Sequence, residues 1–216
     1  MVAYALAVAG TAAVVAALRT GAIPGVIANY VAHAWMAAIA LTWFFVRRRR
    51  FPVGGHNAAS LRPWFVLALI LLAANVIATI VSPPAAGRRL PEAPTLVAQL
   101  VFLAFVVGPT EEFLFRGLIQ TALNRSIPAR IWLRSWPLSA GTVVAAVLFG
   151  VFHLVNAVYQ PIGATVQQAV TAIAIGLVFG VLYDRSKNLV GASLAHSVAD
   201  FSGTAIPLLA YVVINR

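Results

Sequence analysis

The chain contains no cysteine, which excludes disulfides, a cysteine nucleophile and thiolate metal ligands. Charge is nearly as scarce, because only 9% of the 216 residues are charged and only five of them are acidic. A soluble domain carries about 25% charged residues, so this chain lacks the polar surface needed to face water. The hydrophobic share of 62% and the mean hydropathy of +0.93 therefore indicate an integral membrane protein.

Long runs of Ala, Val, Leu and Ile, without the polar and apolar alternation of barrel strands, predict helices. The expected fold is an all-α transmembrane bundle of about eight spans, divided into helices without a recognised motif (1–94) and a catalytic bundle (95–216). The spans are expected near 2–18, 23–46, 64–82, 95–120, 139–157, 165–183, 188–201 and 203–215. The last two are short, and one broken helix is the alternative. The first span has no basic residues before it, so we interpret it as retained.

Basic residues are distributed unevenly between the two sides of this eight-span arrangement. The loops on the N-terminal side carry eleven of the fifteen lysines and arginines, the opposite side carries Arg19, Arg88 and Arg89, and Arg116 lies within a span. Because cytoplasmic loops are enriched in basic residues, we expect both termini in the cytoplasm. The same rule and anionic lipid headgroups account for the net charge of +10 without nucleic acid.

Arginines and aromatic residues alternate between Asn124 and Leu138. The pattern fits an amphipathic segment lying in the cytoplasmic interface. It fits an ordinary aromatic-belt loop equally well, and the sequence leaves the two open.

Three of the five acidic residues fall in apolar segments, where an ionised carboxylate is costly. Glu112 and Arg116 are spaced i,i+4 with the acid first, which predicts an ion pair. Glu111 points about 100° away around the helix, without a local partner, and suits a general base. Pro109 is expected to kink this span beside the site. Glu92 and Asp184 lie in loops or at helix ends, where acidic residues are ordinary.

Two other spans each place a histidine on the same helix face as an aromatic or an acidic residue. Phe149 and His153 are spaced i,i+4, and so are His196 and Asp200. An isolated histidine in a membrane can serve helix packing alone. Two histidines and three carboxylates at membrane depth favour a functional site. The remaining histidines, His33 and His56, are interpreted as incidental, although His33 lies within the second span.

These residues, in this order, resemble the CPBP family of intramembrane proteases, also called the CAAX protease and bacteriocin-processing (Abi) family. Its pattern is E-E-x-x-x-R, F-x-x-x-H and H-x-x-x-Asn/Asp. The chain matches it with Glu111-Glu112 and Arg116, then Phe149 and His153, then His196 and Asp200. The resemblance covers about residues 95–201.

The resemblance implies a site open toward the cytoplasm that cleaves a membrane-associated protein or peptide. Glu111 and His153 would activate a water, and His196 and Asp200 would position the substrate or stabilise the oxyanion. Glu112, Arg116 and Phe149 would support the site. Eukaryotic prenyl-protein proteases of the family have Asn at the position of Asp200. An ionised Asp200 cannot donate a hydrogen bond, so orienting His196 is its expected role.

The sequence leaves the metal and the rival functions open. A metal-free glutamate mechanism is favoured over a divalent metal bound by Glu111, His153 and His196, because the Glu112–Arg116 pair opposes a nearby cation. A proton-coupled transporter would show a second polar cluster or an internal repeat, and the sequence shows neither. A non-enzymatic membrane partner or immunity protein could share the same residues. Ser193 beside His196 suggests a rhomboid-like serine protease only weakly, since both lie on one helix.

The substrate and the oligomeric state are not readable from the sequence. Fourteen arginines against one lysine, with abundant alanine, indicate a GC-rich bacterial genome. We therefore expect a protein of the bacterial cell membrane.

Overall fold

The computed structural model describes residues 2–22, 25–47, 58–84, 92–133, 136–158 and 160–215. Several expectations made from the sequence concern residues outside these ranges. They are the arginines at 48–50, His56, Arg88, Arg89, Arg134 and Arg216.

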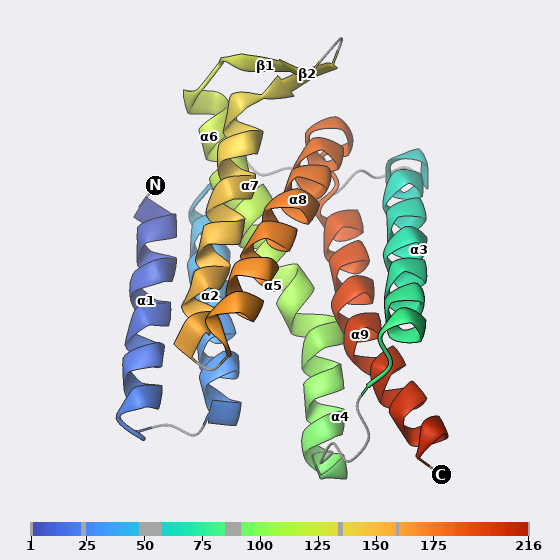
Figure 1. Cartoon of the computed structure of the whole chain (residues 1–216). Helices are drawn as coiled ribbons and strands as arrows, with labels where there is room; N and C mark the ends of the chain where they lie inside the picture. Colours follow the sequence, from blue (N-terminus) through green and yellow to red (C-terminus); the bar gives the residue numbers. More distant parts are fainter. Residues whose placement is uncertain are drawn as a thin grey trace.

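The fold is an elongated bundle of helices, as expected (Figure 1). Within the described ranges, seven helical segments are long and apolar enough to cross a membrane. They are α1 (Val2–Arg19), α2 (Gly25–Arg47), α3 (Ala58–Val81), the continuous run from α4 to α6 (Ala93–Ser126), α7 with η4 (Ala140–Val158), α8 (Ile162–Ser186) and α9 (Leu189–Ile214).

The expected count of eight spans is wrong by one. The segments 188–201 and 203–215 form a single helix, α9, which continues through Pro207. At 1.5 Å per residue its 26 residues span about 39 Å, which is enough for one crossing of a hydrocarbon core of about 30 Å and too little for two. Val2 and Asn215 consequently lie at opposite ends of the bundle (Figure 1). If all seven segments cross the membrane, the two termini lie on opposite sides of it, whereas both were expected in the cytoplasm.

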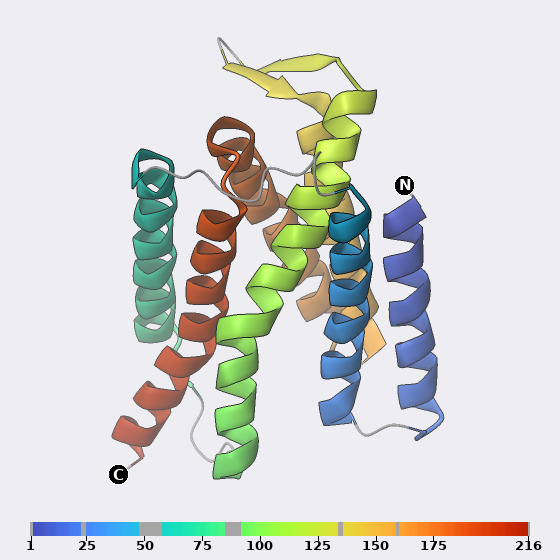
Figure 2. The ribbon, with the colours of Figure 1, turned by 180° about the vertical axis from the view of Figure 1, so that it is seen from behind.

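The fourth crossing is interrupted by two π-helical stretches on either side of a short α-helix. α4 (Ala93–Phe102) leads into η2 (Leu103–Val107), and α5 (Gly108–Glu112) leads into η3 (Phe113–Gln120) and α6 (Thr121–Ser126). Pro109 lacks an N–H and its ring displaces the carbonyl one turn earlier, at Phe105 within η2. The axis changes direction between α4 and α5 (Figure 2), as the proline predicted.

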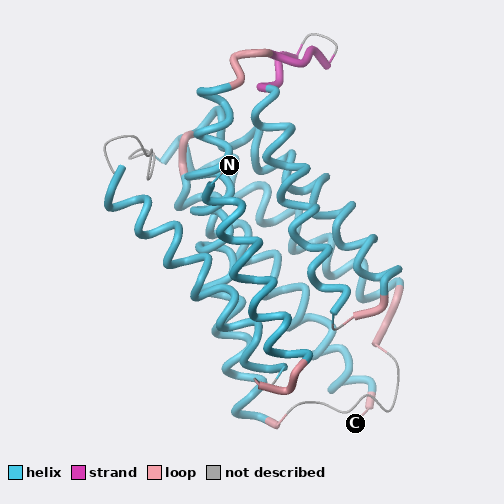
Figure 3. Tube along the Cα trace, turned by 90° about the vertical axis from the view of Figure 1, so that its left-hand side faces the viewer, coloured by secondary structure: helices cyan, strands magenta, loops and turns pink. Residues whose placement is uncertain are grey.

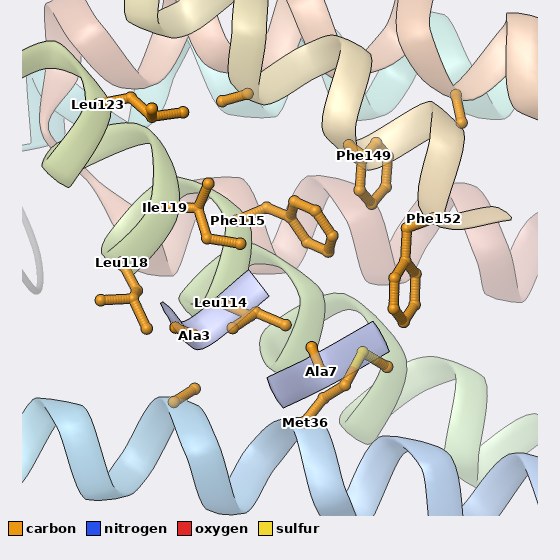
Figure 4. Close-up of a cluster of buried hydrophobic side chains, with 13 residues drawn as sticks. Ala3, Ala7, Met36, Leu114, Phe115, Leu118, Ile119, Leu123, Phe149 and Phe152 are labelled. Carbon is orange, nitrogen blue, oxygen red and sulfur yellow. The ribbon is translucent and has the colours of Figure 1, made fainter. Parts of the chain in front are cut away.

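Aromatic side chains fill the space between this crossing and α7. Phe115 lies edge-on to Phe149 and Phe152, with ring centroids 4.9 and 5.7 Å apart, and the cluster extends to Met36 of α2 (Figure 4). Because lipid tails are as apolar as these side chains, association of the helices depends on close packing. At Gly150 of α7 an added Cβ would lie only 2.5 Å from the carbonyl oxygen of Ala169 in α8, so glycine is required for that approach.

A short antiparallel hairpin caps the bundle at the end where α6 ends and α7 begins (Figure 3). Strands β1 (Arg130–Leu133) and β2 (Trp136–Ser139) pair with Arg130 opposite Ser139. The segment Asn124 to Leu138 thus contains a hairpin, which the sequence did not predict. Trp132 and Ile131 are exposed, which agrees with a position at the membrane interface.

A second polar cluster lies below the hairpin, between η3, α6, α7 and α8. Gln120 and Asn124 donate to Asp184 Oδ1 at 3.0 and 2.7 Å, and Thr142 donates to Asp184 Oδ2. Ser139 donates to Asn124 Oδ1 at 2.6 Å. Asp184 therefore joins three crossings, a role that the sequence did not reveal. The absence of a second cluster was one argument against a transporter, and that argument fails.

Candidate active site

A cavity of about 910 Å³ is lined by residues from six of the seven membrane-spanning segments. Its lining includes Glu111 from α5, His153 at the start of η4, and His196 and Asp200 from α9. It also includes His33 from α2. The four side chains that the sequence marked as catalytic thus share one cavity, and a histidine interpreted as incidental lies among them.

Glu112 and Arg116 lie behind the cavity wall and hold His196. Arg116 Nε lies 3.2 Å from Glu112 Oε2, and both side chains are almost completely buried. His196 Nδ1 lies 2.8 Å from Glu112 Oε1. A carboxylate paired with an arginine accepts hydrogen bonds, so Nδ1 carries the hydrogen and Nε2 is directed away from Glu112. Glu112 therefore fixes the orientation of the His196 ring in addition to forming the expected ion pair.

The Arg116 guanidinium is held on two further sides. Its carbon lies 4.6 Å from the centre of the Phe149 ring and 5.5 Å from that of Phe179, which are cation–π distances. Its Nη2 donates to the carbonyl of Gly176 in α8 at 3.3 Å. The supporting role expected for Phe149 is thus contact with Arg116. The same ring also lies edge-on to His153 at 4.8 Å.

Glu111 was expected to lack a local partner on its own helix, and the structure shows two histidine neighbours from other helices. Its Oε1 lies 3.4 Å from His33 Nε2, and its Oε2 lies 3.6 Å from His196 Nε2. Local helical spacing could not reveal these contacts, because both partners come from other helices. The carboxylate is 6% exposed, so the open side of this group faces only the cavity.

His153 and Asp200 complete the site from the other walls. His153 Nδ1 lies 2.8 Å from the carbonyl oxygen of Phe149, which makes Nδ1 a donor and leaves Nε2 as the basic nitrogen. Asp200 Oδ2 lies 3.5 Å from His196 Nε2. His196 Nδ1 donates its short hydrogen bond to Glu112, so Glu112 also orients the ring, while Asp200 contacts the ring from the side of Nε2.

Close contact between α5 and α9 places the two glutamates beside His196. At Gly108 an added Cβ would lie 2.8 Å from the backbone nitrogen of Ser197 and 2.9 Å from the carbonyl oxygen of Ser193. Only glycine allows this approach. Ser193 Oγ is buried without a hydrogen-bond partner in the described structure, so Ser193 and His196 do not form a serine–histidine pair.

A metal site would need several donor side chains gathered around one position. Among the described residues, no three His, Asp or Glu side chains are gathered so that they could hold an ion. His196 Nε2 is directed at two carboxylates at 3.5 and 3.6 Å, and Arg116 places a positive charge next to Glu112. The residues in this arrangement do not fit a metal, and no step below runs through one.

The cavity extends toward the end of the bundle opposite the hairpin. Its lining reaches Leu18 near the end of α1, Thr95 near the start of α4, and Gln160 between η4 and α8. The described basic residues Arg62, Arg125, Arg130, Arg185 and Lys187 lie at the hairpin end, and Arg19 lies at the other end (Figure 1). The cavity therefore opens away from the arginine-rich end. The cytoplasmic opening expected from the resemblance would place this arginine-rich end outside the cytoplasm, against the positive-inside rule.

The fold and the site define a polytopic membrane protein with an internal acid–base centre. The family model described as type II CAAX prenyl endopeptidase Rce1-like matches residues 93–202, more than half of the chain. The chain belongs to this family of membrane endopeptidases, in agreement with the resemblance seen in its motifs. No curated protein and no solved structure matches the chain.

Proposed function

We propose that the chain hydrolyses a peptide bond of a membrane-associated protein or peptide inside this cavity. The observation that supports this proposal is that Glu111 and His153, from different helices, line the same cavity as His196 and Asp200. Acid and base groups that face one cavity are an arrangement suited to activating a water molecule.

Glu111 acts as the general base in this proposal. It takes a proton from a water molecule while the water oxygen attacks the scissile carbonyl carbon, and His153 Nε2 accepts a hydrogen bond from the same water. His196, when protonated at Nε2, positions the carbonyl group and stabilises the tetrahedral intermediate, and Asp200 supports His196 from 3.5 Å. The C–N bond then breaks, and the proton held by Glu111 passes to the departing amine.

The lining of the cavity favours an uncharged segment as substrate. Beyond the acid–base residues it consists of apolar side chains, including Val14 and Met36, of amides, including Gln99 and Gln168, and of hydroxyl side chains, including Thr11. No lysine or arginine belongs to the described lining. Amide side chains can pair with an extended peptide backbone. The family description makes a prenylated C-a-a-X peptide one candidate, and an apolar segment of a bacterial membrane protein is the other.

A cleavage assay tests the catalytic proposal. The purified protein in detergent is incubated with quenched apolar peptides and with prenylated and unprenylated C-a-a-X peptides, with and without EDTA. We expect cleavage by the wild type, a fall of about 10²- to 10⁴-fold in His153→Ala, and no effect of EDTA. Inhibition by EDTA would support the metal alternative. Absence of cleavage by the wild type, or full activity of His153→Ala, would favour a binding or transport protein.

We further propose that the hairpin end is cytoplasmic and that the cavity opens on the opposite side of the membrane. The positive-inside rule supports the first part, because five of the described basic residues named above lie at the hairpin end. The second part follows from the cavity lining near Leu18, Thr95 and Gln160. The bond to be cleaved is then presented from outside the cytoplasm.

Cysteine labelling tests this orientation without background, because the chain has no cysteine. Thr20→Cys and Ile131→Cys place a thiol at exposed positions near opposite ends of the bundle. A membrane-impermeant maleimide should label Thr20→Cys in right-side-out vesicles and Ile131→Cys in inverted vesicles. The reverse pattern would contradict the proposed orientation, and labelling of both from one side would contradict the seven-span fold.

A further inference from the structure

His33 is the one site histidine that lies outside the region matched by the family model. It belongs to α2, whereas the matched region begins at residue 93, with α4. Its side chain is 9% exposed, and its ring lies edge-on to Phe102 at 5.1 Å. It also lines the cavity. A polar ring held at this depth needs partners for both of its nitrogens.

The two ring nitrogens of His33 have different surroundings. Nδ1 lies 2.9 Å from the carbonyl oxygen of Asn29, one turn earlier in α2, and a carbonyl only accepts, so Nδ1 carries the hydrogen. Nε2 makes no hydrogen bond that meets strict geometry in the described structure. The atom that it faces is Glu111 Oε1, at 3.4 Å. A hydrogen carried by either His33 Nε2 or Glu111 Oε1 would lie between these two atoms and would link the ring to the carboxyl group.

This contact determines which way the Glu111 carboxyl group faces. One oxygen is directed at His33 from α2 and the other at His196 from α9. Rotation of the carboxyl group about its last bond would break both contacts. A general base held at both oxygens presents a fixed edge to the cavity, and errors of about 1 Å at such a site can lower rates by about 10²-fold.

We propose that His33 is a positioning residue for Glu111, so that α2 completes the acid–base site from outside the family-matched region. The proposal rests on the proposed function, because it assigns His33 a role only through Glu111. The length and shape of the side chain then matter, since the contact requires a polar atom at the position of Nε2 and the bond to Asn29 requires one at the position of Nδ1.

Two amide substitutions test the contacts of the two His33 ring nitrogens separately. His33→Gln places an amide near the position of Nε2 and can still reach Glu111. His33→Asn places its amide near Nδ1, where it can bond to Asn29 but not to Glu111. We expect His33→Asn to lower kcat by about 10- to 100-fold with KM changed less than about twofold. His33→Gln should remain within a few-fold of wild type.

Trp35→Phe is the matched control on the same helix. It removes the hydrogen bond from Trp35 Nε1 to the carbonyl of Leu6 in α1, at 2.9 Å, without touching Glu111. Its kcat should equal that of the wild type. Thermal unfolding in detergent is measured for all variants, so that each kcat is referred to folded protein.

The outcomes separate this proposal from the one on which it rests. Full activity of His33→Asn, with Glu111→Gln inactive, would overturn the role of His33 and leave the catalytic site intact. Equal loss in His33→Gln and His33→Asn would also overturn it, because the contact with Glu111 would then not matter. Full activity of Glu111→Gln would overturn the proposed function itself.

Discussion

Replacing Glu111 with glutamine is expected to reduce kcat by about 10³-fold or more. Glutamine has nearly the same shape and can keep contacts with His33 and His196, but it cannot take a proton from water. The residue lies in the cavity wall and is 6% exposed, and among the described lining residues it is the only glutamate. Initial rates with the best peptide of the cleavage assay, divided by the folded fraction, measure the effect.

Glu92→Gln is the appropriate control for this substitution. It makes the same chemical change at an exposed position just before α4, outside the cavity lining. We expect its rate to match the wild type. Comparable activity of Glu111→Gln and Glu92→Gln would exclude Glu111 as the base.

Replacing Arg116 with methionine is expected to lower the free energy of unfolding by about 3 to 5 kcal/mol. The substitution leaves Glu112, which is 0% exposed, without its countercharge at 3.2 Å. It also removes the cation–π contact with Phe149 and the hydrogen bond to Gly176. Reversible unfolding in mixed detergent micelles measures the loss, and α-helical content reports the transition.

The double variant Glu112→Gln with Arg116→Met should recover much of this loss, because it removes the buried charge together with its partner. Arg62→Met, an exposed arginine near the start of α3, should change stability by less than about 0.5 kcal/mol. If the double variant is no more stable than Arg116→Met, the buried charge of Glu112 is not the cause of the loss.

Helical spacing predicted the contacts that lie within one helix and missed those between helices. The Glu112–Arg116 pair followed from an i,i+4 spacing, because a helix places such residues on one face. The bond between Glu112 and His196 joins two crossings that are far apart in sequence, and no local rule contains that information. His33 was missed for the same reason. A buried polar residue in the second span was the only available signal.

The errors in topology have a different origin. Hydropathy divides α9 at the polar residues around Asp200, because these residues interrupt the apolar run. The polar group belongs to the site, and the helix continues past it. Similarly, Asp184 was placed correctly at a helix end, but its hydrogen bonds to Gln120 and Asn124 depend on the packing of α8 against η3 and α6.

The sequence by itself determined that this protein is a membrane-embedded helix bundle, that it carries the three family motifs, and which residue types are available for chemistry. These properties depend on composition and on spacing within single helices, which are local. The tertiary structure alone decided the number of membrane-spanning segments, the end of the bundle toward which the cavity extends, and the partners of Glu111 and His196. Those properties depend on which helices pack against one another, and close approaches such as that at Gly108 fix the packing.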